Sequence, residues 1–336
     1  MPFLSEDPGI RAENPVFCCI LANTYLSTIP GVSGAGPTPG KTLITPILDA
    51  ELIATGGITS MPARPDTPTG CPTPASITRA MMELIGIPPF FVNAGLSGKP
   101  TVPCIDAGGE PGKDPRVEDS VPGAEALFKA GKSIGRQFGR YSDLLVLGEC
   151  VPGGTTTALC TLRALGYDAK VSSSYVTNPV AIKEEICRAA ISRLLTTGAS
   201  GPIAICRSVG DPMFPVALGI SAGYGGTLVL AGGTQMLTVA ALAKARGLPV
   251  PAVATTVFVR DDKTANFCGI AGAVGARAIF VDPGFDRIGH PGLARYCMGE
   301  VKEGMGAGGA MLLASIMGHS PESIRDAIYR TVSGYS

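Results

Sequence analysis

The chain has 336 residues, of which 45% are hydrophobic and only 16% are charged, and its 27 basic residues balance its 27 acidic ones. A chain this apolar can bury enough surface to offset the entropy lost on ordering, which excludes a disordered protein. It has neither a run of basic residues nor basic residues interleaved with aromatic ones, and this argues against nucleic acid as the main partner.

Short apolar runs typical of buried strands recur along the chain, and helix-like segments separate many of them. The predicted strands are, in order, Phe17–Leu21, Thr101–Ile105, Leu144–Leu147, Pro202–Cys206, Thr227–Leu230, Val253–Val259 and Arg277–Val281. The predicted helices are Gly123–Phe138, Thr156–Leu165, Pro179–Leu195, Thr234–Arg246 and Thr264–Gly275. This alternation predicts an α/β fold with a Rossmann-like parallel sheet that helices cover on both faces. A ligand is then expected beyond the carboxyl ends of the strands.

One segment, residues 212–243, carries no charge at all. Several glycines divide it, so we expect a buried helix, a buried strand and a second helix rather than a membrane span. The N-terminus lacks a basic region followed by an apolar stretch, and no signal peptide is expected.

The ten cysteines form no C-x-x-C pair, and His290 and His319 are the only histidines. Several cysteines fall inside strand-like runs, so we expect buried free thiols in a reducing cytoplasm. The spacing of cysteine and histidine residues predicts no metal site.

A glycine-rich turn directly follows the predicted strand Leu144–Leu147. It reads Gly148-Glu-Cys-Val-Pro-Gly-Gly-Thr-Thr-Thr157 and leads into a helix. Backbone N–H groups and the positive end of the helix dipole converge at such a turn, which favours a bound phosphate. The spacing copies a P-loop, but Gly154 takes the place of its lysine, so we reject an NTPase and expect one phosphate monoester. An ordinary strand-to-helix turn capped by threonine is the alternative.

A second glycine cluster follows Glu303. Gly304, Gly306 and Gly309 match G-x-G-x-x-G, but no apolar strand precedes them, and a dinucleotide site is therefore not expected. Glu303 instead precedes a glycine turn that opens a small-residue helix, predicted over Ala307–Met317. Close glycine packing would desolvate this carboxylate and raise its pKa toward that of a general base. Alternatively, Glu303 is a solvated residue favoured by the helix dipole.

Together these motifs resemble those of the nicotinate-nucleotide:dimethylbenzimidazole phosphoribosyltransferase family. Residues 147–158 resemble its G-E-x-x-x-x-N-T-T-x-A loop, and residues 302–307 resemble its C-terminal G-E-G-[ST]-G-A motif. Residues 55–60 and 73–82 look like its base-pocket segment, and residues 104–108 look like its V-D-x-G strand end. The resemblance spans nearly the whole chain and is that of a divergent relative, from the archaeal and cyanobacterial branch.

The resemblance implies a transferase that moves the phosphoribosyl group of nicotinate mononucleotide onto an aromatic base similar to dimethylbenzimidazole. The product would be an α-ribazole phosphate for the lower ligand of cobalamin, and nicotinate would be released. Glu303 would take the proton from the attacking nitrogen of the base. The residues implied to hold the phosphate and ribose are Glu149, Cys150, Gly153, Gly154, Thr155, Thr156, Lys183, Gly304 and Gly306, and those implied to border the base are Ser60, Thr73 and Thr78.

The resemblance also implies a cytoplasmic homodimer that needs no metal and no other cofactor, with small molecules rather than nucleic acid or a membrane as its partners. Residues 86–285 would form the Rossmann-like, phosphate-binding domain. Residues 1–85 and 286–336 would together form a smaller domain that carries the base-pocket segments and the catalytic glutamate.

The chain departs from the family pattern at three motif positions, and the family's phosphate-holding basic residue has no clean counterpart, for which Lys183 is the nearest candidate. Gly154 replaces the asparagine of the loop, Lys302 replaces the glycine before the catalytic glutamate, and Ala231–Met236 occupies the place of a D-G-F segment. Two other functions therefore stay open: a non-catalytic nucleotide-binding sensor on the same fold, and a sister transferase with a purine or phenolic acceptor.

Overall fold

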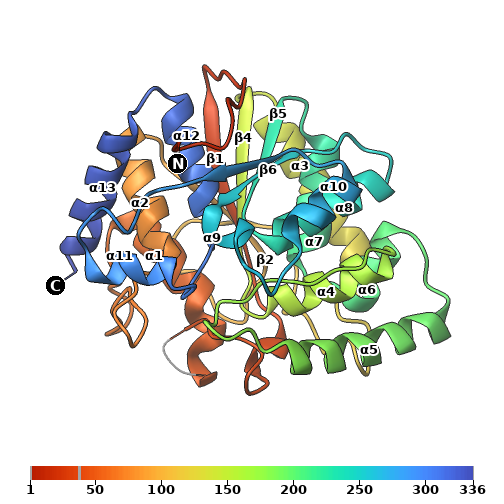
Figure 1. The fold of residues 1–336 in the computed structure, drawn as a ribbon. Coiled ribbons are helices and arrows are strands. Elements are labelled where there is room, and N and C mark those ends of the chain that lie inside the picture. Colours follow the sequence, from red (N-terminus) through yellow and green to blue (C-terminus); the bar gives the residue numbers. More distant parts are fainter. Residues whose placement is uncertain (1, 37–38, 336) are drawn as a thin grey trace.

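The computed structural model describes residues 2–36 and 39–335. They form a seven-stranded sheet in the order β3-β2-β1-β4-β5-β6-β7 (Figure 1), and every neighbouring pair is parallel. The strands are β1 (Pro15–Ala22), β2 (Phe90–Gly95), β3 (Ile105–Asp106), β4 (Leu144–Cys150), β5 (Thr227–Ala231), β6 (Ala252–Thr256) and β7 (Ala278–Val281). The predicted α/β fold with a Rossmann-like parallel sheet is confirmed.

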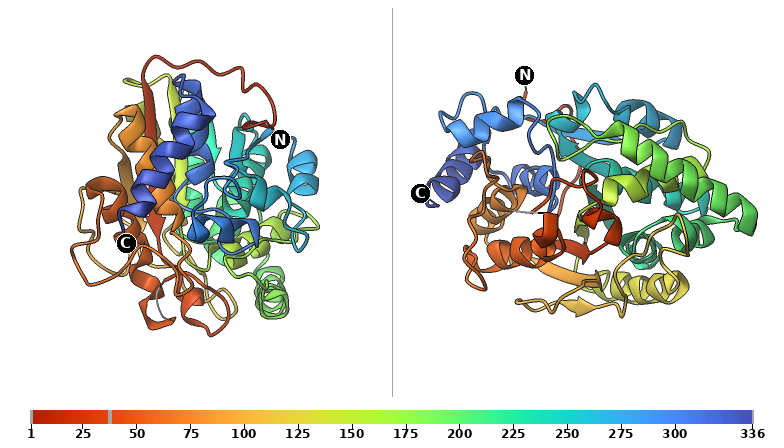
Figure 2. Two further views of the ribbon diagram at one scale, coloured as in Figure 1. Left: turned by 60° about the vertical axis from the view of Figure 1, so that its left-hand side comes forward. Right: turned by 90° about the horizontal axis from the view of Figure 1, so that it is seen from below.

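Helices cover both faces of this sheet (Figures 1 and 2), as predicted. The helices packed into the core on one face are α3 (Ala124–Phe138), α4 (Gly154–Ala164), α5 (Val180–Thr197), α6 (Pro202–Val209), α7 (Met213–Gly223), α8 (Thr234–Ala245) and α10 (Phe267–Val274). Those on the other face are α1 (Thr45–Thr55), α2 (Pro74–Ile85), α11 (Pro291–Cys297), α12 (Ala307–Ile316) and α13 (Pro321–Ser333). The short helical turns η1 (Tyr25–Thr28), η2 (Pro39–Ile44) and α9 (Val257–Arg260) complete the described elements.

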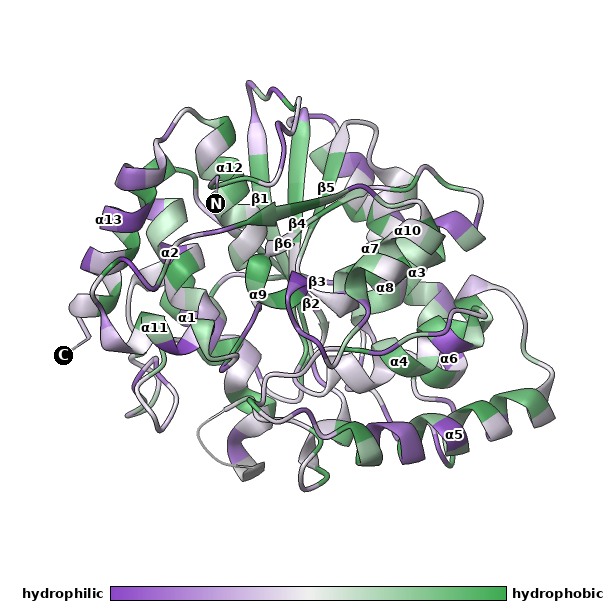
Figure 3. Cartoon of the chain, in the orientation of Figure 1, coloured by the Kyte–Doolittle hydropathy of each residue, from purple (hydrophilic) through white to green (hydrophobic). Residues whose placement is uncertain are grey.

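The central strands are apolar on both sides because each face packs against helices. Cys18 and Ile20 of β1 enter one core, whereas Phe17, Cys19 and Leu21 enter the other. Strand side chains point alternately to the two faces, so a strand covered on both sides needs a continuous apolar run. Figure 3 shows this hydrophobic colour along the central strands, while the long outer helix α5 has both hydrophilic and hydrophobic residues.

Three of the predicted strands differ from the structure. Pro202–Cys206 is not a strand: Pro202 starts α6, and a proline suits the first turn of a helix because it has no N–H to leave unpaired. The strand predicted over Thr101–Ile105 is reduced to the two residues of β3. The strand predicted over Val253–Val259 ends at Thr256, where α9 begins. A short apolar run does not by itself distinguish a buried strand from a buried helix.

The N-terminal segment contributes to the sheet itself. Strand β1 lies between β2 and β4, so residue 86 is not a boundary of the sheet. Helices from both ends of the chain do pack together, since α2 contacts α12 and α13. They form the layer that covers one face. The division into two domains at residues 86 and 285 stays a prediction.

The uncharged segment, residues 212–243, folds as predicted into helix α7, strand β5 and helix α8. In the described ranges, every helix is too short or too polar to span a bilayer. Seven of the ten cysteines are buried free thiols, as expected, whereas Cys104 is partly exposed and Cys268 and Cys297 are exposed.

Candidate functional site

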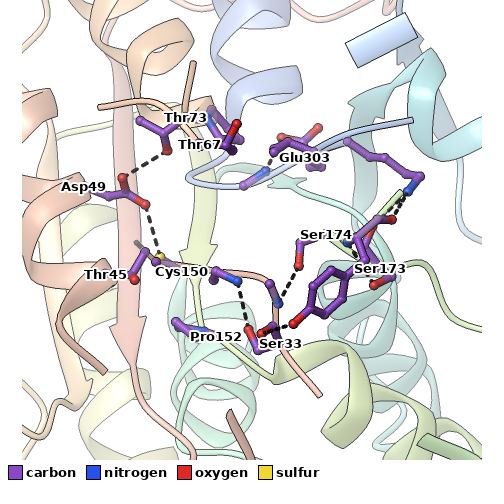
Figure 4. A pocket seen from close by; sticks show the side chains of 18 of the residues that line it. Ser33, Thr45, Asp49, Thr67, Thr73, Cys150, Pro152, Ser173, Ser174 and Glu303 are labelled. Atoms are coloured by element: carbon purple, nitrogen blue, oxygen red, sulfur yellow. Dashed lines mark hydrogen bonds between the residues drawn. The ribbon is translucent and has the colours of Figure 1, made fainter. Parts of the chain in front are cut away.

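A cavity of about 730 Å³ opens at the carboxyl ends of the strands, where the fold predicts a ligand. It is lined mainly by residues 32–36, 63–69, 149–153, 172–177, 233–235 and 300–305. Figure 4 shows Asp49, Thr73 and Cys150 on one side of this pocket, Ser173 and Ser174 on the other, and Glu303 above the two serines. The two glycine motifs, which are far apart in the sequence, therefore share one cavity.

Glu303 reaches the pocket from the loop that precedes α12. Its carboxylate accepts hydrogen bonds from the N–H groups of Gly304 (3.1 Å) and Gly308 (3.2 Å) and lies 3.3 Å from the Thr255 hydroxyl. Burial raises the pKa of Glu303 to about 7, although these hydrogen bonds favour the ionised form. A carboxylate with a pKa near neutral pH is suited to general base chemistry.

The loop that carries Glu303 is strained on both sides of it. Val301 has a φ of 50° and Met305 has a φ of 48°, although neither is glycine. Left-handed backbone costs a residue with a Cβ about 1–3 kcal/mol, most for a β-branched one, and persists where surrounding contacts fix it. Here the Met305 carbonyl accepts from the buried Thr78 hydroxyl (3.0 Å), and its N–H donates to the Glu149 carbonyl (3.0 Å). The surrounding contacts thus fix the position of Glu303.

Glu149 is the penultimate residue of strand β4 and is buried near Glu303. Its carboxyl group accepts from the Gln235 amide and from the N–H of Val151 (3.1 Å). Burial, with the nearby charges of Asp211 and Glu303, raises the pKa of Glu149 to about 8. A carboxyl group with this pKa is mainly protonated at neutral pH, so Glu149 can donate a hydrogen bond.

Asp49 forms a third acidic point in the pocket. It lies on α1 and accepts hydrogen bonds from the Thr73 hydroxyl (3.1 Å) and the Cys150 thiol (3.7 Å). Burial raises the pKa of Asp49 to about 7. Of the residues predicted to bind, Thr73 and Cys150 therefore line the pocket as one hydrogen-bonded group, and Asp49, which nothing in the motifs indicated, joins them.

The predicted phosphate loop lies at the N-terminus of α4. Gly153 has a φ of 81°, and a Cβ there would lie 3.1 Å from the backbone nitrogen of Ser27, so only glycine fits. Gly153 and Thr155 line the pocket. Gly154 instead faces the Gln235 side chain, and Thr156 is buried with its hydroxyl unpartnered among the described residues.

Gly304 and Gly306 form the turn after Glu303. Gly304 lines the pocket, whereas Gly306 packs beneath it, where a Cβ would lie 3.2 Å from the Cα of Gly148. The positive φ of Gly306, 70°, also favours glycine. The approach of Gly306 to Gly148 thus places the two motifs in direct contact.

Two of the predicted base-pocket residues do not line the cavity. Ser60 is exposed, and its hydroxyl and N–H donate to Glu51, which also binds Thr59. Despite burial, these hydrogen bonds hold the pKa of Glu51 down at about 2. Thr78 lies inside α2 and supports the Glu303 loop through Met305.

Lys183, the predicted phosphate-binding cation, is buried behind the pocket wall and donates to the Ser172 carbonyl (2.7 Å). Burial lowers the pKa of Lys183 to about 7. Lys302 lines the pocket, but its ammonium donates to the carbonyls of Ser173 (2.9 Å), Tyr175 (3.2 Å) and Gly299 (2.9 Å). Both lysines thus bind the backbone of the segment that starts at Ser172.

The sequence analysis did not predict an ion pair that lies in the pocket wall. Glu300 binds Arg295 (2.7 Å) and accepts from the hydroxyls of Thr67 (2.7 Å) and Thr69. Despite burial, the hydroxyls and the arginine hold the pKa of Glu300 below its usual range. This group joins the loop at residues 63–69 to the Glu303 loop. In the described part of the chain, no three His, Cys, Asp or Glu side chains gather as a metal centre would require.

Comparison with known proteins gives both close relatives and a shared fold. No protein-family model matches the chain. A UPF0284 protein of Methanosarcina mazei is 41% identical over 338 residues, which cover 98% of this chain and 97% of that protein. A UPF0284 protein of Methanothermobacter thermautotrophicus is 41% identical over 333 residues, which cover 95% of this chain and 93% of its own.

Among solved structures, the nicotinate-nucleotide-dimethylbenzimidazole phosphoribosyltransferase from Thermus thermophilus is similar with a TM-score of 0.62 at 17% identity. The match covers 97% of this chain and 87% of that one. A structure of CobT from the same organism gives a TM-score of 0.60 at 18% identity, covering 96% and 84%. The shared fold and the archaeal relatives confirm the resemblance to a divergent branch that the motifs indicated.

Proposed function

The chain belongs to the UPF0284 protein family, and we propose that it is a phosphoribosyltransferase that uses nicotinate mononucleotide and an aromatic base. The observation that carries the proposal is the position of Glu303. This carboxylate, with its pKa raised to about 7, faces the same cavity as the loop at residues 149–155, on the fold of the solved transferases.

The geometry supports a direct displacement at C1′ of the ribose. The phosphate would lie against the N-terminus of α4, where Gly153 and Thr155 line the cavity, because a helix N-terminus favours an anion. A nitrogen of the acceptor base would form the new bond to C1′ as the bond from C1′ to nicotinate breaks. Glu303 would take the proton that the attacking nitrogen loses, and nicotinate would leave with the electrons of the broken bond.

The acceptor would occupy the side of the pocket bordered by Asp49 and Thr73. Hydrophobic and polar residues both line this region, with Leu48, Ile58 and Pro74 close in sequence to the two polar ones. A flat aromatic base fits such a wall, since its faces can be buried while its ring nitrogens meet polar groups. We propose dimethylbenzimidazole or a related base as the acceptor and an α-ribazole phosphate as the product.

The test is a chromatographic assay of the purified protein with nicotinate mononucleotide and, in separate reactions, 5,6-dimethylbenzimidazole, adenine or a phenol. We expect nicotinate release that depends on the base, together with a new ribosylated product. Release of nicotinate without any base would indicate hydrolysis and contradict the proposal. Binding of the nucleotide by calorimetry without turnover would instead favour a nucleotide sensor. The proposed homodimer is tested in the same preparation by light scattering.

A further inference from the structure

Two buried lysines bind the backbone of one pocket-lining segment, Lys302 from the pocket wall and Lys183 from behind it. Lys302 and Lys183 are 7% and 1% exposed, and their ammonium groups lie near the carboxylate of Asp262. That carboxylate is 3.7 Å from the Lys302 ammonium and accepts from the Ser172 hydroxyl (2.7 Å). Burying two long cationic side chains costs free energy, and hydrogen bonds from their ammonium groups are needed to offset that cost.

The contacts are to three carbonyls within four residues. Lys183 binds the carbonyl of Ser172, and Lys302 binds the carbonyls of Ser173 and Tyr175. In a trans peptide the N–H of the next residue points opposite to the carbonyl. The N–H groups of Ser173, Ser174 and Val176 are therefore directed away from the lysines, and residues 172–177 line the cavity.

The N–H groups of Ser173, Ser174 and Val176 belong to residues that line the cavity. Within residues 2–36 and 39–335, none of these N–H groups has a hydrogen-bond partner. Backbone donors beside a cavity must be satisfied by water or by a ligand. Carbonyls held by ammonium groups polarise their peptides and make the opposite N–H groups better donors to an anion.

We propose that Lys302 is a positioning residue for the phosphate of the substrate. By holding the carbonyls of Ser173 and Tyr175, it directs the N–H groups of Ser174 and Val176 toward a phosphate monoester in the pocket. The phosphate would then lie between this segment and the loop at residues 150–155. The inference rests on the proposed function for the identity of the ligand, and it gives a role to the lysine that departs from the transferase motif.

Lys302 is placed to connect phosphate binding with the catalytic glutamate. It is the residue before Glu303, and its own carbonyl accepts from the Thr256 hydroxyl (2.6 Å). The segment at residues 172–177 also contacts the loop at residues 32–36, since the Tyr175 hydroxyl donates to the Ser33 carbonyl (2.8 Å) and the Gly34 N–H to the Ser174 hydroxyl (3.3 Å). A phosphate that orders residues 173–176 would thereby also hold the Glu303 loop in place.

The experiment compares nicotinate mononucleotide with its unphosphorylated nucleoside, nicotinate riboside, by calorimetry. Lys302→Met keeps the length of the side chain and removes its charge. We expect it to weaken binding of the mononucleotide by about tenfold or more, since hydrogen bonds to charged groups are at stake, and to change riboside binding by less than about twofold. The control is Lys244→Met, an exposed lysine at the end of α8 whose ammonium donates to the Ala273 carbonyl (2.8 Å).

An equal loss for both ligands would show that Lys302 serves only the general structure of the site, and would overturn the inference. If Lys302→Met does not fold, Val176→Pro provides the second test. Proline has no backbone N–H, so this change removes one of the proposed donors, and it does so at a position whose side chain is exposed. Retention of full phosphate preference in Val176→Pro would contradict the proposal. Absence of nicotinate release in the wild type would contradict the proposed transferase function but not the role of Lys302, since the preference for the phosphorylated ligand is measured by binding.

Discussion

The main-chain N–H of Met305 donates to the main-chain carbonyl of Glu149 across 3.0 Å. This hydrogen bond joins the end of β4 to the loop that carries Glu303, although the two segments are more than 150 residues apart. Because the bond involves only backbone atoms, it does not depend on the side chain of either residue. It places the proposed phosphate loop and the proposed base against each other.

The first prediction concerns Glu303. In Glu303→Gln the side chain keeps its size but cannot accept a proton, so we expect kcat to fall by about 10²- to 10⁴-fold, the usual contribution of a catalytic base. Calorimetric binding of nicotinate mononucleotide should change little. The matched control is Glu322→Gln, an exposed residue at the start of α13. Wild-type turnover in Glu303→Gln would remove this residue from the mechanism.

The second prediction is the pH dependence of turnover. Burial raises the pKa of Glu303 to about 7, and only the ionised carboxylate can accept a proton. The rate should therefore rise as the pH increases from about 5.5 and level off above about 8, following a single ionisation at the pKa of a general base. The measurement is kcat in a series of buffers at constant ionic strength. A rate that falls over this range would mean that the required form of the group is the protonated one.

The sequence predicted the sheet and both motifs because the signals there are local. Each signal lies within about a dozen consecutive residues: one comprises the apolar run of β4 and the glycines after it, and the other comprises the Glu303 turn. Strand order and the Asp49–Cys150 contact depend on segments far apart in the chain, and periodicity contains no information about such pairs. The predicted role of Ser60 had the same weakness, since its partner Glu51 lies on a helix that the sequence analysis did not predict.

The missed helix α6 has a different cause. Its run of apolar residues is short, and a run of that length fits a buried strand as well as a buried helix. The sequence does not predict the burial of Lys183 and Lys302 either, because lysine is usually found at the surface. In each case the tertiary packing, rather than the local preference of the residues, determined the result.

The third prediction concerns the stability of the fold against pH. Asp211 is fully buried and accepts from the Thr157 hydroxyl (2.6 Å) and the Met213 N–H (3.0 Å), and burial raises its pKa to about 7. A carboxyl whose pKa is higher in the folded than in the unfolded chain stabilises the fold at low pH. This contribution is lost as the pH rises toward 7, by about 1.4 kcal/mol for each pH unit between the two pKa values.

The side chain introduced by Asp211→Asn cannot ionise. The free energy of unfolding of this variant should therefore not decrease with rising pH by the amount that Asp211 contributes in the wild type. Urea unfolding of both proteins at several pH values from about 5 to 8 tests it, because the slope with denaturant reports the same transition throughout. Asp49, Glu149 and Glu303 have pKa values raised in the same direction and remain in both proteins. The difference between the two curves therefore reports Asp211 together with its effect on Glu149, whose pKa the charge of Asp211 helps to raise. Parallel curves would show that Asp211 has the same pKa in the folded and unfolded chain.

The fourth prediction follows from two departures from the transferase motifs that turn out to be in contact. Gly154 occupies the position of the family's asparagine, and Gln235 belongs to the segment that replaces D-G-F. A Cβ at residue 154 would lie 2.5 Å from the amide nitrogen of Gln235, which in turn donates to the carboxyl group of Glu149. The Gln235 side chain thus fills space beside Gly154, and each departure permits the other.

A double-mutant cycle measures this dependence. Gly154→Ala adds a methyl group against a held side chain, so it should cost about 1–3 kcal/mol of stability, as overpacking of a filled site does. Gly154 has no left-handed backbone, so the cost is steric. In the Gln235→Ala background the space is open, and Ala at residue 154 should be nearly neutral or favourable because it suits a helix better than glycine does. Costs that add to within about 0.3–0.5 kcal/mol would show that the two positions are independent. The two departures would then have to be explained separately.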